Sequence, residues 1–323
     1  MPAVSVIVPV FKVEPYMARC ARSLFAQTLD DVEYIFIDDC SPDDSMKVME
    51  SILREEFPSR IPQVKCIRMP RNSGQAKVRM LGISLATGDY VIHCDSDDEV
   101  DISAYETMYR TAVDNNFDIV SCDILTGNEG AWRVKSCSSL PGRELADILN
   151  GDVMGSLWSR MVKRTLLEDL VSPAGNLAED MVIVIQAVSR AKSFAHIDRP
   201  LYHYFVRDGS ATQAAGYESA LYKYESMFAN VNLSLELLNG QDIGLADIVL
   251  FKYRSRYFLE PYVHLPEIYC KWKSTFPEVD RQLFSTRGIP FSVKFWNILI
   301  RLHLFHPWKC VTGFFRNIRS KRK

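Results

Sequence analysis

The stretch Asp89-Tyr-Val-Ile-His-Cys-Asp-Ser-Asp-Asp-Glu99 decides the fold that we expect of this chain. Its apolar run Tyr90–Ile92 follows a Thr-Gly turn signal and predicts a short strand. Three carboxylates, Asp95, Asp97 and Asp98, follow at the carboxyl end of that strand, where open α/β sheets bind ligands. Carboxylates suit Mg²⁺ or Mn²⁺, which often bind through one or two carboxylates and substrate phosphates. An acidic surface turn would show the same pattern, so the neighbouring segments must decide.

Strand and helix patterns alternate over the first 122 residues. One helix start is marked by Ser41 as N-cap and Pro42 at the first helical position. Alternating elements with short connections indicate an α/β fold, with a mainly parallel sheet and helices on both faces. The other predicted elements are strands at 3–10, 32–37, 64–69 and 117–122, and helices at 15–27, 75–87 and 101–116.

Polar residues gather at one predicted edge of this sheet. The second strand ends in Asp38-Asp39, and Arg71-Asn72 follows the third. Together with the acidic cluster after the fourth strand, they indicate a nucleotide-phosphate site. The chain has no Gly-x-Gly-x-x-Gly after its first strand and no Gly-x-x-x-x-Gly-Lys-Ser/Thr. The first absence argues against a dinucleotide-binding Rossmann domain, and the second excludes a P-loop.

The regular alternation ends after about residue 123. Glu179 and Asp180 lie where a strongly apolar helix begins, a place where acidic residues also serve simply to stabilise a helix end. The other predicted segments are a loop at 124–141, a helix at 142–150, a strand or edge segment at 155–162, a helix at 181–191, a strand at 196–204, a polar loop at 207–212 and helices from 217 to about 276.

The composition is that of an ordinary globular protein, with 47% hydrophobic and 24% charged residues. The eight cysteines form no Cys-x-x-Cys pair, so they indicate neither a zinc site nor a disulfide framework. The N-terminus lacks a basic segment and runs directly into a strand-like run, so we expect no signal peptide. These observations favour a reducing cytoplasm.

In this order and spacing, the segments resemble the family 2 glycosyltransferases, which have the nucleotide-diphospho-sugar transferase (GT-A) fold. The resemblance covers about residues 3–212. It implies a GT-A glycosyltransferase domain over 1–212, with a nucleotide-binding half at 1–123 and an acceptor half at 124–212. Residues 213–323 would form a helical C-terminal region with a basic amphipathic tail.

The nucleotide half carries several motifs of that family. The first strand, with Pro9 and Phe11, resembles the strand that frames the nucleotide base. The segment Ile-Asp-Asp-Cys-Ser, which contains Asp39, resembles Val-Asp-Asp-Gly-Ser, whose second carboxylate binds the base. The stretch from Asn72 to Arg79 resembles the Asn-x-Gly…Ala-Arg-Asn segment that lies along the nucleotide.

The acidic cluster is similar to the family's Asp-x-Asp signature, which holds the metal and the ribose. The resemblance therefore implies that Asp97 and Asp98 bind Mn²⁺ or Mg²⁺ and that Asp95 lies at the nucleotide sugar. Arg207 resembles the arginine that faces the diphosphate. A metal and an arginine would both stabilise the charge that builds on the departing phosphate.

The acceptor side is carried by two later segments. Glu179-Asp180 resembles the Glu-Asp pair whose aspartate is the catalytic base. The segment that begins at Trp158 is similar to the Trp-x-Lys-Leu-Tyr-x-Arg stretch beside the acceptor, although its next residues depart from that pattern. We therefore expect Asp180 to accept the proton of the acceptor hydroxyl, with Trp158 and Glu179 beside the acceptor.

The expected function is inverting sugar transfer from an NDP-sugar, with a UDP-sugar as the first choice, to a growing cell-surface glycan or a lipid-linked acceptor. A single base opposite the leaving group gives in-line displacement and inversion. Two alternatives stay open. One is a metal-dependent nucleotidyl or phosphoryl transferase, and the other is a non-catalytic sugar-nucleotide-binding protein at a membrane. No nucleic-acid partner is expected.

The end of the chain has its own charge pattern. Residues 281–323 contain ten Lys or Arg and no acidic residue, whereas residues 1–280 contain 28 basic and 40 acidic residues. Within 291–306, Lys294, Asn297 and Arg301 fall on one helical stripe among apolar residues. An amphipathic helix with a basic end would bind anionic lipid and place the enzyme on the inner face of the cell membrane. A helix packed on the core with a solvated basic end is the alternative.

Overall fold

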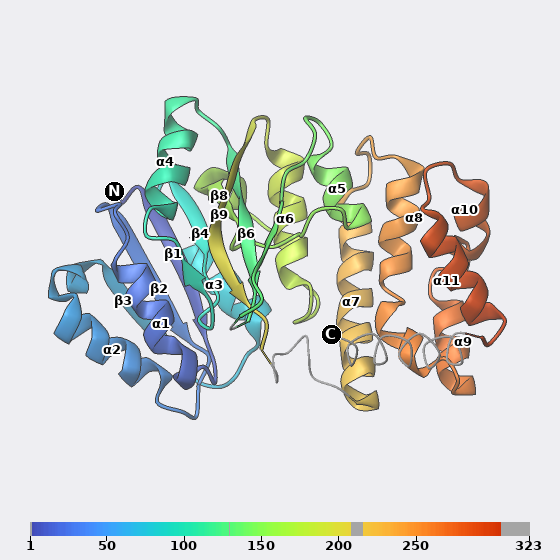
Figure 1. Ribbon diagram of the computed structural model, residues 1–323, viewed down its shortest axis with the longest axis horizontal. Helices are drawn as coiled ribbons and strands as arrows, with labels where there is room; N and C mark the ends of the chain where they lie inside the picture. The colour runs from blue at the N-terminus through green and yellow to red at the C-terminus, as the bar shows by residue number, and fades with distance from the viewer. Residues whose placement is uncertain (1, 129, 208–215, 305–323) are drawn as a thin grey trace.

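A computed structural model of the chain describes residues 2–128, 130–207 and 216–304. It shows a mixed sheet flanked by helices, with further helices side by side toward the C-terminal end (Figure 1). The strand order is β3-β2-β1-β4-β8-β6-β9-β5, and β7 pairs with β6 off this path. The strands are β1 (Val4–Val10), β2 (Val32–Asp38), β3 (Val64–Arg68), β4 (Tyr90–His93), β5 (Glu99–Val100), β6 (Ile119–Gly127), β7 (Arg133–Lys135), β8 (Arg160–Lys163) and β9 (Phe194–Phe205).

The first part of the chain forms the parallel part of the sheet, as its pattern predicts. Strand β1 pairs in parallel with β2 and β4, and β2 pairs in parallel with β3. Both β1 and β2 are buried along their whole length, which explains their runs of Val and Ile. The segments that follow β1, β2 and β4 therefore meet at one edge of the sheet. The helices of this part are α1 (Glu14–Phe25), α2 (Ser45–Glu56), α3 (Gln75–Leu85) and α4 (Ala104–Asp114).

Helix α2 begins later than its capping pattern predicts. The pattern places the N-cap at Ser41 and the first helical residue at Pro42, but the N-cap is Asp44 and the helix begins at Ser45. The Ser41 hydroxyl accepts a hydrogen bond from the Lys12 backbone N–H at 2.8 Å and donates one to Asp43 Oδ1 at 2.6 Å. Because that hydroxyl joins the loops after β1 and β2, it does not cap the helix.

The sheet is mixed beyond β4. Strand β8 is antiparallel to both β4 and β6, and β6 is parallel to β9. The sequence predicts a loop at 124–141, but β6 extends to Gly127 and β7 pairs with it. The strand predicted at 155–162 is shorter in the structure, where β8 begins at Arg160. In these segments strand pairing, and not the local pattern, sets the structure. The helices here are α5 (Glu144–Asn150) and α6 (Glu179–Arg190).

The C-terminal helices enclose a second buried cluster, separate from the core around the sheet. At its centre the fully buried guanidinium of Arg256 lies 4.6 Å from the ring centre of Trp272 and pairs with Asp280 at 2.6 Å. This cluster gives the helical region a core of its own, while the boundary at 212/213 stays a prediction. The helices are α7 (Tyr217–Leu237), α8 (Leu245–Arg254), α9 (Pro266–Ser274), α10 (Val279–Ser285) and α11 (Phe291–Arg301).

Helix α11 shows how the predicted tail lies as far as residue 304. Asn297 and Ile300 are fully buried in the helical region, and the Asn297 side chain donates a hydrogen bond to Asp280 at 3.2 Å. The stripe of Lys294, Asn297 and Arg301 is therefore not an exposed polar face. Residues 305–323, which hold the rest of the basic end, lie outside the described residues. No helix within the described residues is long and apolar enough to cross a membrane.

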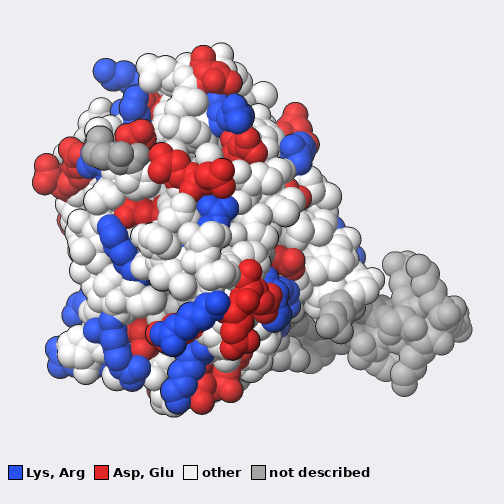
Figure 2. All heavy atoms as spheres, turned by 90° about the vertical axis from the view of Figure 1, so that its left-hand side faces the viewer, with Lys and Arg blue, Asp and Glu red and all other residues white. Residues whose placement is uncertain are grey.

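The face on the side of α2 and β3 carries both signs of charge. Figure 2 shows basic and acidic side chains interspersed over it, with no single patch of either sign. Several of these charges pair on the surface of the first helices. Surface pairs of this kind contribute roughly 0–1 kcal/mol each, so this face is a solvated surface and not a main source of stability.

Candidate active-site cleft

A cleft of about 700 Å³ opens at the carboxyl ends of β1, β2 and β4. Its lining contains every residue predicted for the site except Asp98. These residues are Pro9, Phe11, Asp39, Asn72, Arg79, Asp95, Asp97, Trp158, Glu179, Asp180 and Arg207. The structure thus brings together side chains that lie nearly 200 positions apart in the sequence.

Asp39 is fixed by backbone groups at the end of β2. Its two oxygens accept hydrogen bonds from the N–H groups of Ser73 and Gly74, at 2.7 and 2.8 Å. Cys40, beside it, has a φ of 58°, in the left-handed region that favours glycine. That backbone conformation explains why the resembling motif has Gly where this chain has Cys. The carboxylate is buried and held in a single orientation.

A buried ion-pair network joins the two walls of the cleft. The Arg79 guanidinium donates to Asp95 at 2.8 Å and to Glu179 at 3.1 Å. Burial raises the pKa of Glu179 to about 7, with a further contribution from Asp180 and opposition from Arg79. Arg79, although buried, has its pKa raised by these carboxylates. This network connects helix α3 to helix α6 across the cleft.

Asp97 and Arg207 form the second ion pair, with 2.5 Å between Asp97 Oδ2 and Arg207 Nε. The Arg207 guanidinium also lies 4.7 Å from the ring centre of Tyr16, a cation–π contact. Burial and the nearby Asp95 raise the pKa of Asp97, and Arg207 opposes that shift. Each of Asp95 and Asp97 has one carboxylate oxygen in an arginine contact, so both keep a second oxygen for a ligand.

Asp98 lies behind the cleft. Its carboxylate accepts hydrogen bonds from the Tyr202 hydroxyl at 2.7 Å and from the Phe205 N–H at 2.8 Å, and the residue is 1% exposed. The same Tyr202 oxygen accepts a hydrogen bond from the Asp95 N–H. Burial and the two neighbouring aspartates raise the pKa of Asp98 well above its ordinary value. Through these two hydrogen bonds, Asp98 links strand β9 to the acidic segment after β4.

Asp180 occupies the first turn of α6, after Ala178 in the left-handed region with φ 59°. Its Oδ1 accepts a hydrogen bond from the Met181 N–H at 2.8 Å. Enclosure by protein raises the pKa of Asp180, while Arg79 and the backbone N–H lower it. A carboxyl with a raised pKa at the wall of a cleft is a candidate base.

Trp158 is a further aromatic residue of the cleft lining. Its indole stacks on the rings of Tyr202 and Tyr204, with centres 4.4 and 5.6 Å apart, and it is 4% exposed. Trp158 lines the cleft, but most of its surface packs in this aromatic stack. It therefore offers a ligand only one edge of the ring system.

Four residues of the C-terminal helices also line the cleft, and the sequence patterns did not identify them. Arg254 of α8 reaches the cleft and donates from Nη1 to the carbonyls of Ile148 and Leu149 at 2.9 and 3.0 Å. In the sequence, all four lining residues occupy ordinary polar or apolar positions of helices, so no local pattern identifies them. The four are Tyr222, Lys223, Met227 and Arg254.

One further group can hold a metal ion by its geometry. Among the described residues, the ligand atoms of Asp123, His196 and Asp198 lie within 4.8 Å of one another. His196 Nε2 is 2.9 Å from Asp123 and 3.4 Å from Asp198. None of the three lines the cleft, so this group is separate from the acidic segment after β4.

Comparisons with known proteins agree with this geometry. The family model for glycosyl transferase family 2 matches residues 5–171. Among curated proteins, the chain is 31% identical over 252 residues to EpsH of Bacillus subtilis (strain 168), which bears a glycosyltransferase name, covering 73% of this chain and 71% of EpsH. Several further curated relatives also carry glycosyltransferase names.

Solved structures share the fold. Residues 1–349 of S. aureus TarS, in complex with UDP-GlcNAc, match with a TM-score of 0.67 and 22% identity over 98% of this chain and 92% of that one. The mannosyltransferase PcManGT from Pyrobaculum calidifontis, in complex with GDP-Man and Mn²⁺, matches with a TM-score of 0.53 and 14% identity, over 95% of this chain and 86% of that one. These likenesses confirm the predicted GT-A fold.

Proposed function

The chain belongs to glycosyl transferase family 2 and is a glycosyltransferase. From that premise we propose that it catalyses an inverting sugar transfer from a UDP-sugar, or from another NDP-sugar. The acceptor is a hydroxyl of a growing surface glycan or of a lipid-linked molecule. One observation carries the proposal. A single cleft is lined by the fixed carboxylate of Asp39 and by the carboxyl of Asp180, with Asp97 and Arg207 also in its lining.

The nucleotide end of the cleft fits a base and a ribose. Asp39 is buried and oriented by two backbone N–H groups, so it can accept a hydrogen bond from a ring N–H of the base. Pro9 and Phe11 line the cleft beside it, and Phe11 is 38% exposed, which leaves its ring available for stacking. Asn72 completes this end.

The centre of the cleft fits a divalent ion and a diphosphate. Asp95 and Asp97 each have one oxygen free of arginine contact, and carboxylates together with phosphate oxygens are the ligands that Mn²⁺ and Mg²⁺ prefer. We assign the metal to Asp97 with support from Asp95, and not to Asp98, because both hydrogen bonds to Asp98 come from β9. A bound ion stabilises the charge of the leaving diphosphate.

Arg207 has a role that follows from its pairing. It holds Asp97 in the free protein, and a diphosphate beside Asp97 would compete for the same guanidinium. Arg207 would then bind the diphosphate, and both oxygens of Asp97 would be available to hold a divalent ion. The planar guanidinium group matches the oxygens of a carboxylate and of a phosphate equally well, so the same arginine can change from one partner to the other.

The acceptor end contains the base. Glu179 forms an ion pair with Arg79. Among the described residues, the Asp180 carboxylate accepts a hydrogen bond only from the Met181 N–H of its own helix, and burial raises its pKa. Asp180 therefore takes the proton from the acceptor hydroxyl as that oxygen attacks the anomeric carbon. Glu179 positions Arg79 and the acceptor end of the cleft, and Trp158 supplies an aromatic edge.

The basic tail belongs to this proposal as a membrane contact. Phe291, at the start of helix α11, is 79% exposed, and Leu302, directly after the basic Arg301 at its end, is 60% exposed. Exposed apolar groups together with a basic group suit an anionic lipid surface on the inner face of the cell membrane. Removal of residues 305–323 should lower binding to vesicles of anionic lipid in a sedimentation assay while α11 and its buried residues stay in place. Equal sedimentation with and without these residues would refute the contact.

A donor screen tests the proposed reaction. UDP- and GDP-sugars are added to the enzyme with Mn²⁺, with Mg²⁺ and with excess chelator, and the products of slow hydrolysis are measured. Release of the nucleoside diphosphate, dependent on metal, supports glycosyl transfer. Release of pyrophosphate would instead indicate nucleotidyl transfer, and unchanged turnover in chelator would refute the metal assignment.

A further inference from the structure

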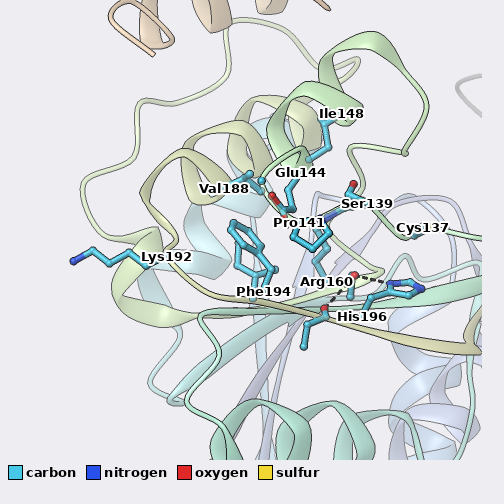
Figure 3. A pocket seen from close by; sticks show the side chains of 14 residues that line it. Cys137, Ser139, Pro141, Glu144, Ile148, Arg160, Val188, Lys192, Phe194 and His196 are labelled. Atoms are coloured by element: carbon cyan, nitrogen blue, oxygen red, sulfur yellow. Dashed lines mark hydrogen bonds between the residues drawn. The ribbon is translucent and has the colours of Figure 1, made fainter. Parts of the chain in front are cut away.

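A second cavity lies apart from the cleft, between the sheet and helices α5 and α6. Its volume is about 420 Å³, within the range of cavities that hold small molecules. Strand residues Phe194 and His196 line one side, and Glu144 and Val188 of the two helices line the other (Figure 3). It shares no lining residue with the cleft.

The cavity contains a buried cation that has no direct counter-ion among the described residues. Three arginines are buried among the described residues, and two of them have carboxylate partners: Arg79 pairs with Asp95 and Glu179, and Arg256 with Asp280. The third, Arg160, is 4% exposed and forms no ion pair with any described residue.

The contacts of Arg160 leave part of its guanidinium for a ligand. Nη1 donates to the Ser156 carbonyl at 2.7 Å and reaches the Ser159 hydroxyl at 3.3 Å. No bond from Nε or Nη2 to a described residue is seen. Burying an arginine without an opposite charge is costly, and burial accordingly lowers the pKa of Arg160.

Other lining groups add polar partners. The Ser121 hydroxyl lies 2.8 Å from His196 Nδ1, and Ser139 also faces the cavity. Glu144 lines the cavity without pairing with Arg160 among the described contacts, and Lys192 stands at the rim with its side chain extended away from the other residues (Figure 3). One buried cation with hydroxyl groups nearby is the usual composition of a site for a carboxylate or phosphate.

We propose that this second cavity binds a small organic or inorganic anion, a carboxylate or a phosphate, on the guanidinium of Arg160. The site touches the cleft indirectly, because the Ser156 carbonyl that Arg160 holds belongs to a residue of the cleft wall. The anion supplies a direct counter-charge in addition to the more distant Asp180, which already favours the charged form of Arg160, and the neighbouring hydroxyls bind the remaining oxygens of the anion.

Calorimetric titration of the full chain tests the site with three probes: inorganic phosphate, glucuronate and uncharged glucose. Phosphate or glucuronate binds and glucose does not, and the stronger of the two anions identifies the preferred group. Arg160→Gln weakens that binding by roughly 10- to 100-fold, the usual worth of a charge-assisted hydrogen bond pair. Arg54→Gln, which removes an exposed cation of helix α2, is the matched control and leaves that binding unchanged.

Two milder variants keep the test decisive if Arg160→Gln does not fold. Glu144→Gln removes the opposing charge and tightens anion binding by roughly 2- to 5-fold, whereas Lys192→Gln changes it by less than about 2-fold. The proposal is overturned if neither anion binds at millimolar concentration, if Glu144→Gln has no effect, or if Arg54→Gln weakens binding as much as Arg160→Gln does.

Discussion

The two walls of the cleft are built in different ways. The nucleotide wall takes Asp39, Asp95 and Asp97 from the segments that follow parallel strands. The opposite wall takes Asp180 from the start of α6 and Arg254 from α8, which packing brings together. The difference teaches that groups after parallel strands converge because of the sheet itself, whereas groups on the other wall depend on tertiary contacts far apart in the chain.

The largest expected effect separates two aspartates of the same acidic segment. Asp97→Asn should lower metal-dependent turnover by roughly 10³-fold or more, because it removes a charged metal ligand from the cleft. Asp98→Asn should keep the metal dependence and lower the free energy of unfolding by about 1–3 kcal/mol, since an amide has one acceptor oxygen for two donors. Turnover against metal concentration, with urea unfolding alongside, measures both. The reverse pattern would move the metal to Asp98.

A substitution in the C-terminal helical region can lower the stability of the protein without changing a residue of either wall of the cleft. Asp280→Ala leaves the buried guanidinium of Arg256 without its counter-ion and should lower the free energy of unfolding by about 3–5 kcal/mol. Glu278→Ala removes the partner of Lys252 on the surface and should change it by less than about 1 kcal/mol. Chemical denaturation of both variants makes the comparison. Equal losses would show that Arg256 does not depend on this pair.

A smaller effect is expected in the pH dependence of the free energy of unfolding, through Glu179 of the ion-pair network that joins the two walls of the cleft. The pKa of Glu179 is raised from 4.5 to about 7, so the folded protein binds this proton more tightly than the unfolded chain does. Stability from this group is therefore full below pH 4.5 and declines as the pH rises toward 7, by roughly 1.4 kcal/mol per pH unit at most. The difference in unfolding free energy between wild type and Glu179→Gln should change over this window. A difference that is constant from pH 4.5 to 7 would contradict the shift.

The sequence predicted which side chains after the parallel strands meet in one cleft, because these strands are short and have clear ends. It placed the N-cap of α2 at Ser41, three residues early, because the Ser41 hydroxyl is used by the neighbouring loop. It grouped Asp98 with Asp97, since nothing in a local motif shows that β9 would cover one of two adjacent carboxylates.

The sequence revealed less of the acceptor wall and the tail. Arg254 lies in an ordinary amphipathic helix, and its place in the cleft depends on how α8 packs against α5. The polar stripe of the tail includes Asn297, which is buried against Asp280, a contact that helical periodicity alone does not predict. Long-range packing decided these positions.

The most direct test of the account compares the two acidic residues at the start of α6. Turnover of Asp180→Asn and Glu179→Gln is measured on the same donor and acceptor, together with the affinity of each variant for the nucleoside diphosphate. The account predicts a loss of roughly 10²–10⁴-fold in kcat for Asp180→Asn with nucleotide affinity nearly unchanged, and a smaller loss for Glu179→Gln. Wild-type turnover in Asp180→Asn, or a failure explained by lost nucleotide binding, would contradict the assignment of Asp180 as the base.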